Sequence, residues 1–476
     1  MKIVLCNTPF GKTDYTWPPI GLLYIASHVK SQTDHNVKVI DGYSSNMPEN
    51  QFLQKIKEEN PDVLGLSCTS HTFLKSMEML EKIRQELPDV VIVLGGMHTN
   101  FYAEKILNNY RFIDFIIKGE GEISFTKLVE NLNNREELRK IKGITFFDGD
   151  EMVNNEAEII QDLDSLPFPD RSLVDGNKYS HNWFGLKFSF GKFATILSSR
   201  GCPYSCIFCC CSAICKRKWR TRSVENILKE LEELHSQGYK TCIFIDDNFT
   251  LSPERVIQIC RGIVERKIKI SLLCEGRIDK MSLEIFREMK KAGFTTILFG
   301  LESGSQKILD YYKKGIKIDR VKNVVAEAKE AGLNVIGSFM IGAPIETEQE
   351  IMQTLKFASS LRTPLIIDSL VMVPGTALWS ELEKNNLLKD DDWKSDHKVN
   401  KYYSNFSEEN LSDYIDYGYK LMIKELKRPR SIGDLTLYLS RYSIKIFLWN
   451  LFRNPITLMK RLIISGIFNR FPKYQK

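Results

Sequence analysis

The stretch FATILSSRGCPYSCIFCCCSAIC, from Phe193 to Cys215, decides how this chain folds. It begins as an apolar run of strand length and continues into a loop that holds six of the chain's 11 cysteines. In this loop Cys202, Cys206 and Cys209 form a C-x3-C-x2-C run, without the distal pair of Cys or His that a zinc site usually has. Three thiolates on one short loop suit a cubane iron–sulfur cluster that keeps one iron free of protein ligands. The spacing therefore predicts these three cysteines as metal ligands and as the catalytic centre.

The run before the cysteine loop is the first of six apolar strands that alternate with helical patterns. The expected strands are Phe193–Ser199, Cys242–Asp247, Ile270–Gly276, Thr296–Ser303, Val335–Gly342 and Leu365–Val373. Six strand and helix units predict an incomplete parallel barrel like part of a TIM barrel, whose chemistry lies at the carboxyl ends of the strands. The cysteine loop follows the first strand, so we expect it at that end.

The residues before the barrel show a second alternation of strands and helices. The expected strands are Lys2–Thr8, Val37–Gly42, Asp62–Cys68, Val90–Gly96 and Phe112–Glu122. Short apolar strands separated by helices predict a doubly wound, Rossmann-like parallel sheet, which binds ligands outside the carboxyl ends of its strands. The candidate contacts at these ends are Thr8, Pro9, Ser67, Gly95, Gly96, His98, Gly119 and Gly121. Most are small, so backbone can approach a large flat ligand, and no G-x-G-x-x-G pattern favours a dinucleotide.

Length and composition divide the chain and exclude several classes of protein. We expect a first unit at 1–140, a linker at 141–190, the barrel at 191–398 and a helical basic region at 399–476. With 43% apolar and 26% charged residues, the 476-residue chain is neither disordered nor fibrous. Neither a signal peptide nor a run of about 18 apolar residues is visible, so we expect a cytoplasmic protein with reduced thiols.

The cysteine run, with Arg200, Gly201 and the aromatic Phe208 beside the last ligand, resembles the signature of the radical S-adenosylmethionine (SAM) superfamily. The resemblance implies that a 4Fe–4S cluster binds SAM through its open iron and, after reduction by one electron, cleaves it to a 5′-deoxyadenosyl radical. It also implies contacts to SAM from polar residues at the strand ends. The candidates are Phe208, Asp247, Arg277, Glu302 and Ser338, with Arg277 suited to the carboxylate of SAM. Loop capping or ion pairing stays open for the last four.

A doubly wound domain ahead of such a barrel looks like the cobalamin-binding subclass of this superfamily. The supporting residues are Trp17–Leu22, Gly95–His98 and Gly119–Glu122. The resemblance implies that cobalamin lies at the strand ends of the first unit, on the contacts named above, and presents one face to the barrel. The D-x-H-x-x-G pattern of a lower histidine ligand is absent, so His98 is not assigned as the cobalt ligand, and that ligand stays open.

Within this subclass the commonest activity is methylation of a carbon that is not nucleophilic, and this is the activity we predict. The resemblance implies that the substrate radical takes methyl from methylcobalamin, which a second SAM restores. Oxidative cyclisation and rearrangement stay open, and nothing in the motifs names the substrate. A methylthiotransferase would need three more cysteines in the first unit, which has only Cys6 and Cys68. A non-enzymatic iron–sulfur protein has no use for a six-unit barrel. The expected partners are a small-molecule or lipid-like substrate and an electron donor such as flavodoxin or ferredoxin.

The last 58 residues differ from the rest in charge. From Tyr419 to Lys476, 13 Lys and Arg stand against two acidic residues, so this segment carries +11, the whole chain +6 and the remainder −5. Basic residues flank two apolar stretches, which suits helices on an anionic membrane surface or a helical cap on the barrel. Membrane contact would place the protein at the inner face of the membrane and favour a lipid or isoprenoid-like substrate. No nucleic-acid motif accompanies the charge. The roles of Cys210, Cys211 and Cys215 and the oligomeric state stay open.

Overall fold

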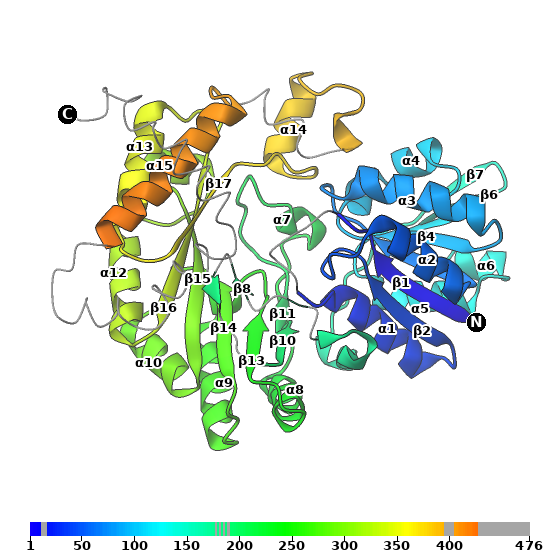
Figure 1. Ribbon diagram of the computed structural model, residues 1–476, viewed down its shortest axis with the longest axis horizontal. Coiled ribbons are helices and arrows are strands. Elements are labelled where there is room, and N and C mark those ends of the chain that lie inside the picture. Colours follow the sequence, from blue (N-terminus) through cyan, green and yellow to red (C-terminus); the bar gives the residue numbers. More distant parts are fainter. Residues whose placement is uncertain are drawn as a thin grey trace.

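The computed structural model describes residues 1–10, 17–176, 179, 182–183, 186–187, 191–394 and 404–426. Two α/β units lie side by side, each built on its own sheet (Figure 1). This architecture confirms the predicted fold class. Of the basic tail only 419–426 are described, so its predicted membrane contact lies outside the described residues. No helix within the described residues is long and apolar enough to cross a membrane.

The first unit is a seven-stranded sheet in the order β2-β1-β3-β4-β5-β6-β7. Its strands are β1 (Lys2–Asn7), β2 (Asn36–Asp41), β3 (Val63–Ser67), β4 (Val91–Gly95), β5 (Phe115–Ile117), β6 (Ile144–Asp148) and β7 (Glu151–Asn154). Strands β1 to β5 are parallel, whereas β6 and β7, from the stretch expected to be linker, add an antiparallel hairpin at the edge. Because β1 lies between β2 and β3, the winding reverses there, which opens a crevice at the strand ends.

Two groups of helices bury the two faces of this sheet. Helices α1 (Ile20–Gln32) and α5 (Gly121–Glu130) cover one face with apolar residues such as Leu22 and Phe125. Helices α2 (Glu49–Glu59), α3 (Phe73–Glu86) and α4 (Thr99–Asn109) cover the other. The short α6 (Arg135–Leu138) precedes the hairpin. Both faces of the strands are therefore apolar, as the unbroken hydrophobic runs predict.

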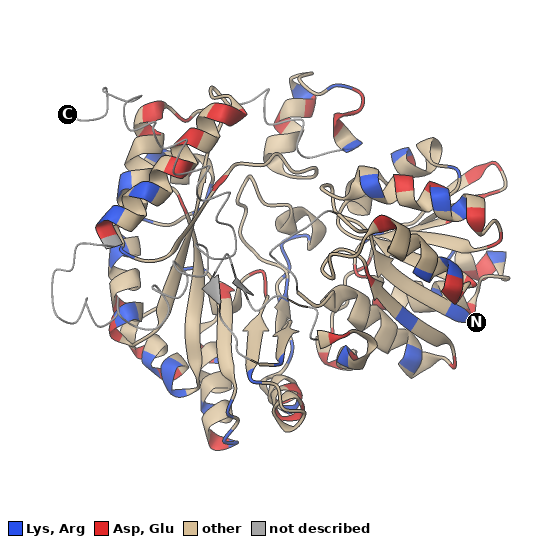
Figure 2. Ribbon diagram, viewed as in Figure 1, with Lys and Arg blue, Asp and Glu red and all other residues tan. Residues whose placement is uncertain are grey.

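The second unit is a six-stranded parallel sheet in chain order, which forms the incomplete barrel. Its strands are β10 (Phe193–Ile196), β13 (Thr241–Phe244), β14 (Ser271–Gly276), β15 (Phe294–Glu302), β16 (Asn334–Ile341) and β17 (Leu365–Ser369). The main outer helices are α8 (Val224–Ser236), α9 (Pro253–Glu265), α10 (Leu283–Lys291), α12 (Ile318–Glu330) and α13 (Glu348–Ser360). An inner apolar layer includes Ile243, Leu273, Leu298, Ile336 and Ile366. Figure 2 shows charged residues mostly on the outer helices of both units.

Smaller elements complete the second unit. Helix α7 (Cys211–Ile214) lies in the cysteine loop, and the short strands β11 (Ser199–Arg200) and β12 (Arg220–Thr221) pair on either side of it. The remaining elements are β8 (Asn182–Trp183), β9 (Leu186–Lys187), α11 (Gln306–Tyr311), α14 (Ala377–Lys384), α15 (Glu408–Leu426) and the short 3-10 helices η1 (Leu163–Ser165), η2 (Arg171–Leu173), η4 (Phe249–Leu251) and η5 (Asp392–Lys394). Helix α15 packs on α13 and β17, where the Ile367 amide donates to the Tyr419 hydroxyl at 3.2 Å. Helix α15 therefore covers part of β17, the last strand of the open barrel.

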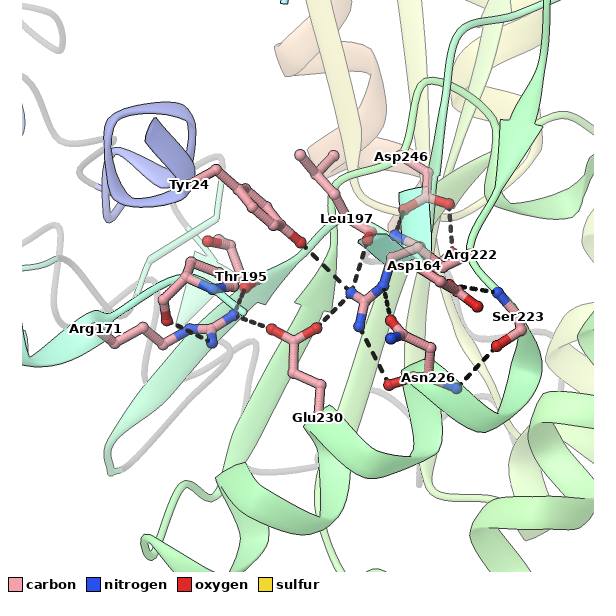
Figure 3. A network of polar contacts seen from close by, with 12 residues as sticks. Tyr24, Asp164, Arg171, Thr195, Leu197, Arg222, Ser223, Asn226, Glu230 and Asp246 are labelled. Atoms are coloured by element: carbon pink, nitrogen blue, oxygen red, sulfur yellow. Dashed lines mark hydrogen bonds and ion pairs between the residues drawn. The ribbon is translucent and has the colours of Figure 1, made fainter. Parts of the chain in front are cut away.

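A buried polar network ties the two units and their connection together (Figure 3). Glu230 of α8 is 1% exposed and accepts Arg171 of η2 on one carboxylate oxygen at 2.7 Å and Arg222 on the other. Arg222 also contacts the Tyr24 hydroxyl of α1 at 3.5 Å and donates to the Leu197 carbonyl at 3.0 Å. The Glu230 carboxylate thus joins the segment between the two units, through Arg171, to the barrel. Arg222 extends this network to the first unit.

Candidate active site

A cavity of about 390 Å³ lies between the first unit and the cysteine loop. One wall is made by residues at the strand ends of the first unit: Ser67, Gly95, Gly96, Met97, Gly119 and Gly121. The facing wall is made by the barrel: Leu197, Arg200, Gly201, Cys211, Ile214, Cys215 and Asp247. The structure therefore brings six of the residues selected from sequence, namely Ser67, Gly95, Gly96, Gly119, Gly121 and Asp247, into one space. It also places the cysteine loop beside that space.

An apolar branch of the cavity reaches between the sheet and helices α1 and α5. Its lining includes Leu5, Gly21, Leu22, Ile25, Gly65, Val93 and Phe125. Gly65 lets Leu5 pack closely on the strand beside this branch, because a Cβ there would lie 2.7 Å from Leu5 Cδ2. A Cβ at Gly21, in contrast, would have no atom within 4 Å. The branch suits a flat apolar group, whereas the mouth offers backbone and small polar side chains.

Tight backbone turns hold the mouth of the cavity in place. Gly96 has φ +101°, and a Cβ there would lie 2.2 Å from the Cys68 carbonyl oxygen. The Gly119 amide donates to Asn100 Oδ1 at 2.7 Å, and Gly119 has φ +76°. Only glycine adopts these conformations without strain, so the sequence pattern at these strand ends has a direct geometric cause.

Three of the predicted contacts of the first unit lie away from the cavity. Thr8 is buried, with its hydroxyl 2.8 Å from that of Ser76, and Pro9 is buried against Gly42. His98 is fully buried, and its ring lies 4.3 Å from that of Phe73. Burial lowers the pKa of His98 to about 4, so it is neutral near pH 7. Its position before α4 directs the ring into the core between α3 and α4.

The cysteine loop is held in a compact shape. Gly201 has φ +85°, and a Cβ there would lie 2.2 Å from the Lys218 carbonyl oxygen. Cys206 is buried, Cys202 and Cys209 are half-buried, and the Cys209 amide donates to the Cys206 carbonyl at 3.1 Å. Besides burial, which raises the pKa of Cys202 and Cys209, the Cys206 thiol raises both further.

The chemistry of this loop's donors suits an iron–sulfur cluster. Cys202, Cys206 and Cys209 all come from one compact loop, in which the Cys209 amide donates to the Cys206 carbonyl at 3.1 Å. This arrangement fits a cluster in which each thiolate binds a different iron.

Two further thiols of the loop face the cavity. The Cys211 and Cys215 sulfurs lie 3.8 Å apart, and both residues line the cavity. The Cys202 amide donates to Cys215 Sγ at 3.4 Å, so Cys215 supports the start of the cysteine run. The sequence left the roles of both residues open, because nothing local indicates which thiols a folded loop turns inward.

The predicted SAM contacts occupy the mouth of the barrel in different ways. Glu302 is 6% exposed with φ +66°, and it pairs with Lys314 Nζ at 2.6 Å. Ser338 is half-buried and shares the inner face with Gly300, its partner in β15. Asp247 is exposed at the cavity and accepts the Gly201 amide at 2.8 Å. The fourth candidate, Arg277, uses most of its donors on protein groups.

Glu275 belongs to the same mouth; the sequence marks it as a polar residue at a strand end but assigns it no contact. It follows Leu273 by two positions on β14 and therefore shares its inward face. Burial, followed by the carboxylates of Asp247 and Asp246, raises the pKa of Glu275 to about 7. Its place at the strand end is visible in the sequence, but its altered pKa depends on burial and on tertiary neighbours.

A pair of arginines locks the cavity wall to the first unit. The β11–β12 register places Arg200 opposite Arg220. Arg200 pairs with Glu122 at 2.6 Å, and Arg220 pairs with Glu120 at 2.7 Å. Burial raises the pKa of Glu120, but Arg220 and Arg200 outweigh it and hold that pKa below its ordinary value. The sequence motifs contain Arg200, Glu120 and Glu122, but they do not indicate which arginine pairs with which glutamate.

Comparisons with known proteins agree on both units. A profile of the Radical SAM superfamily matches residues 196–358, and one of the B12 binding domain matches residues 8–129. The "uncharacterized methyltransferase PH0819" of Pyrococcus horikoshii is 32% identical over 443 residues, which cover 90% of this chain and 95% of that protein. The anaerobic magnesium-protoporphyrin IX monomethyl ester cyclase of Cereibacter sphaeroides is 27% identical, covering 77% of this chain and 60% of that protein.

Solved structures share the fold over nearly the whole chain. The cobalamin-dependent SAM radical enzyme OxsB, with aqua-cobalamin and SAM bound, superposes with a TM-score of 0.71 at 21% identity, over 98% of this chain and 75% of that one. The radical SAM methyltransferase TsrM from Kitasatospora setae, with tryptophan and a SAM analogue bound, gives 0.69 at 17% identity, over 89% of each chain.

Proposed function

We propose that this chain, which belongs to the cobalamin-binding radical SAM enzymes, is a methyltransferase that acts on a carbon that is not nucleophilic. The observation that carries the proposal is the cavity that joins the strand ends of the first unit to the cysteine loop. The relative named as an uncharacterized methyltransferase, 32% identical over nearly its full length, supports methyl transfer. The proposal also includes a small-molecule substrate and an electron donor of the flavodoxin or ferredoxin class.

The residues of the cavity fit both halves of cobalamin. Ser67, Gly95, Gly96, Gly119 and Gly121 would lie against the corrin, since they expose backbone and small side chains. The apolar branch beside α1 and α5 would take the flat base of the nucleotide tail. Thr8, Pro9 and His98 are not part of this proposed site, because all three are buried away from the cavity.

The residues of the loop and barrel mouth fit the other two cofactors. Cys202, Cys206 and Cys209 would hold a 4Fe–4S cluster, and Phe208, Asp247, Glu302 and Ser338 would lie near SAM. When bound, the cluster and SAM supply a carbon-centred radical and cobalamin supplies a transferable methyl group. The chain itself holds the two units together beside this space, because Arg200 and Arg220 bind Glu122 and Glu120 across the wall.

Glu275 would act as a general base or acid at the mouth of the barrel. Its pKa of about 7 lets the carboxylate accept a proton from substrate or return one near neutral pH. Its position on the inward face of β14 supports a role inside the barrel, and it is not among the residues that line the cavity between the units.

The test uses anaerobically reconstituted full-length protein with cobalamin, a strong reductant and SAM labelled in its methyl group, supplied with a small-molecule extract of the source cells. Methyl transfer predicts both 5′-deoxyadenosine and S-adenosylhomocysteine, together with label in an extracted product. The Cys206→Ala variant should form no 5′-deoxyadenosine. Protein with an intact cluster that yields neither nucleoside product would contradict the proposal.

Radical ring closure is the second candidate, because relatives named as magnesium-protoporphyrin ester cyclases match 77% of this chain at 27% identity. The same assay separates the two. Formation of 5′-deoxyadenosine without S-adenosylhomocysteine and without labelled product favours cyclisation or rearrangement.

A further inference from the structure

Arg277 lies directly after β14 and contacts the cysteine loop. It is 7% exposed. Its Nη1 donates to Cys206 Sγ at 3.7 Å, and its guanidinium carbon lies 3.8 Å from the centre of the Tyr204 ring. One guanidinium therefore contacts both a predicted cluster ligand and the residue two positions before it.

The other donors of this guanidinium are already used. Its Nε and Nη2 donate to the two oxygens of Asp279 at 2.7 and 3.0 Å, and Nη2 also donates to the Lys314 carbonyl. The backbone of Arg277 is fixed as well, because the Thr250 hydroxyl accepts its amide and donates to its carbonyl, both at 2.8 Å. Little donor capacity is left for the carboxylate of SAM, which the sequence suggested as its ligand.

Arg277 also connects the cysteine loop to the segment after α11. The Ile207 amide donates to the Tyr312 carbonyl at 3.1 Å, and the Phe208 and Tyr312 rings lie 5.1 Å apart. The carbonyl of Lys314 in the same segment accepts Arg277, while its ammonium pairs with Glu302. The loop is thus held on one side by a short chain segment whose position depends on the guanidinium.

We infer that Arg277 is a positioning residue of the cluster, which donates to the Cys206 sulfur and raises the reduction potential of the bound cluster, rather than a ligand of SAM. A hydrogen bond from a buried cation stabilises the extra negative charge of the reduced cluster, and hydrogen bonds to sulfur are a known determinant of cluster potentials. The inference rests on the proposed function only in requiring that the cluster binds.

The test is a redox titration of the cluster, followed by electron paramagnetic resonance, in reconstituted full-length protein. Arg277→Gln should shift the midpoint to a more negative value, with iron and sulfide content measured beside it. Arg277→Lys should shift it less, because the charge is kept but the planar fork is lost. Arg266→Gln is the matched control, since Arg266 also makes two charged contacts, one each to Glu225 and Glu232, but lies at the end of α9.

A second variant keeps the inference testable if Arg277→Gln fails to load a cluster. Asp279→Asn leaves the arginine in place and removes its neutralising partner, so the midpoint should move in the opposite, less negative direction. Unchanged midpoints in the variants that load a cluster, or weakened binding of SAM in equilibrium dialysis with an unchanged midpoint, would overturn the inference. Absence of a cluster signal from the wild type would instead count against the proposed function.

Discussion

Filling the apolar branch of the cavity should weaken cobalamin binding without unfolding the protein. Gly21 is the second residue of α1, is exposed to the cavity, and has no atom within 4 Å of the place where a Cβ would lie. A Gly21→Leu side chain therefore enters space that the free protein leaves open. In the cofactor-bound protein the same space would hold the tail of cobalamin.

The expected magnitudes follow from two opposite effects. Leucine is a better helix former than glycine, by at most about 0.8 kcal/mol, so the free energy of unfolding of the cofactor-free protein should be equal or slightly higher. Added bulk in an occupied, packed site costs about 1–3 kcal/mol, which corresponds to a loss of cobalamin affinity of about 5- to 150-fold. Gly21→Ala should fall between the wild type and Gly21→Leu.

The measurement is an absorbance titration with hydroxocobalamin, together with cobalt content after desalting and urea unfolding of the cofactor-free protein. Gly176→Leu is the control, because a Cβ there also meets no atom within 4 Å but the residue does not line the cavity. It should bind cobalamin like the wild type. A folded Gly21→Leu protein with wild-type affinity would refute the placement of cobalamin in this cavity.

Three further changes test other parts of the structure. Glu230→Gln leaves Arg171 and Arg222 as buried cations without their carboxylate, so urea unfolding should show a loss of about 3–5 kcal/mol, and a loss below about 1 kcal/mol would contradict the buried network. Burial lowers the pKa of His98 in the folded protein to about 4, so between pH 7 and pH 5 this histidine takes up a proton in the unfolded chain but not in the folded one. Lowering the pH from 7 to 5 should therefore cost the wild type about 2 kcal/mol more free energy of unfolding than it costs His98→Phe, as measured by urea unfolding at both pH values. Gly201→Ala puts a Cβ 2.2 Å from a carbonyl oxygen at φ +85°, so iron and sulfide per chain should fall sharply, and full loading would argue against the loop geometry.

Features that depend only on neighbouring residues in the chain could be predicted from sequence patterns. The cysteine run and the glycines at the strand ends depend on neighbours in the chain, and the structure brings Gly95, Gly96, Gly119 and Gly121 into one cavity with the cysteine loop. His98 and Arg277 show the limit of such reasoning. Each follows a strand closely, yet His98 turns into the core between α3 and α4, and Arg277 is used by Asp279 and the cysteine loop.

Local patterns were enough to predict the two α/β units and the thiol spacing of the cysteine loop. Strand length, alternation and thiol spacing are properties of short segments, and they act through backbone geometry that a segment carries with it. Which polar groups meet depends instead on how distant segments pack. The pairing of Arg200 and Arg220 with Glu122 and Glu120 arises from segments about 80 to 100 residues apart, and the two-stranded β11–β12 ladder sets it. The pKa of Glu275 likewise depends on burial and on carboxylates of a neighbouring strand end, since electrostatic energies follow distance in space and not position in the chain.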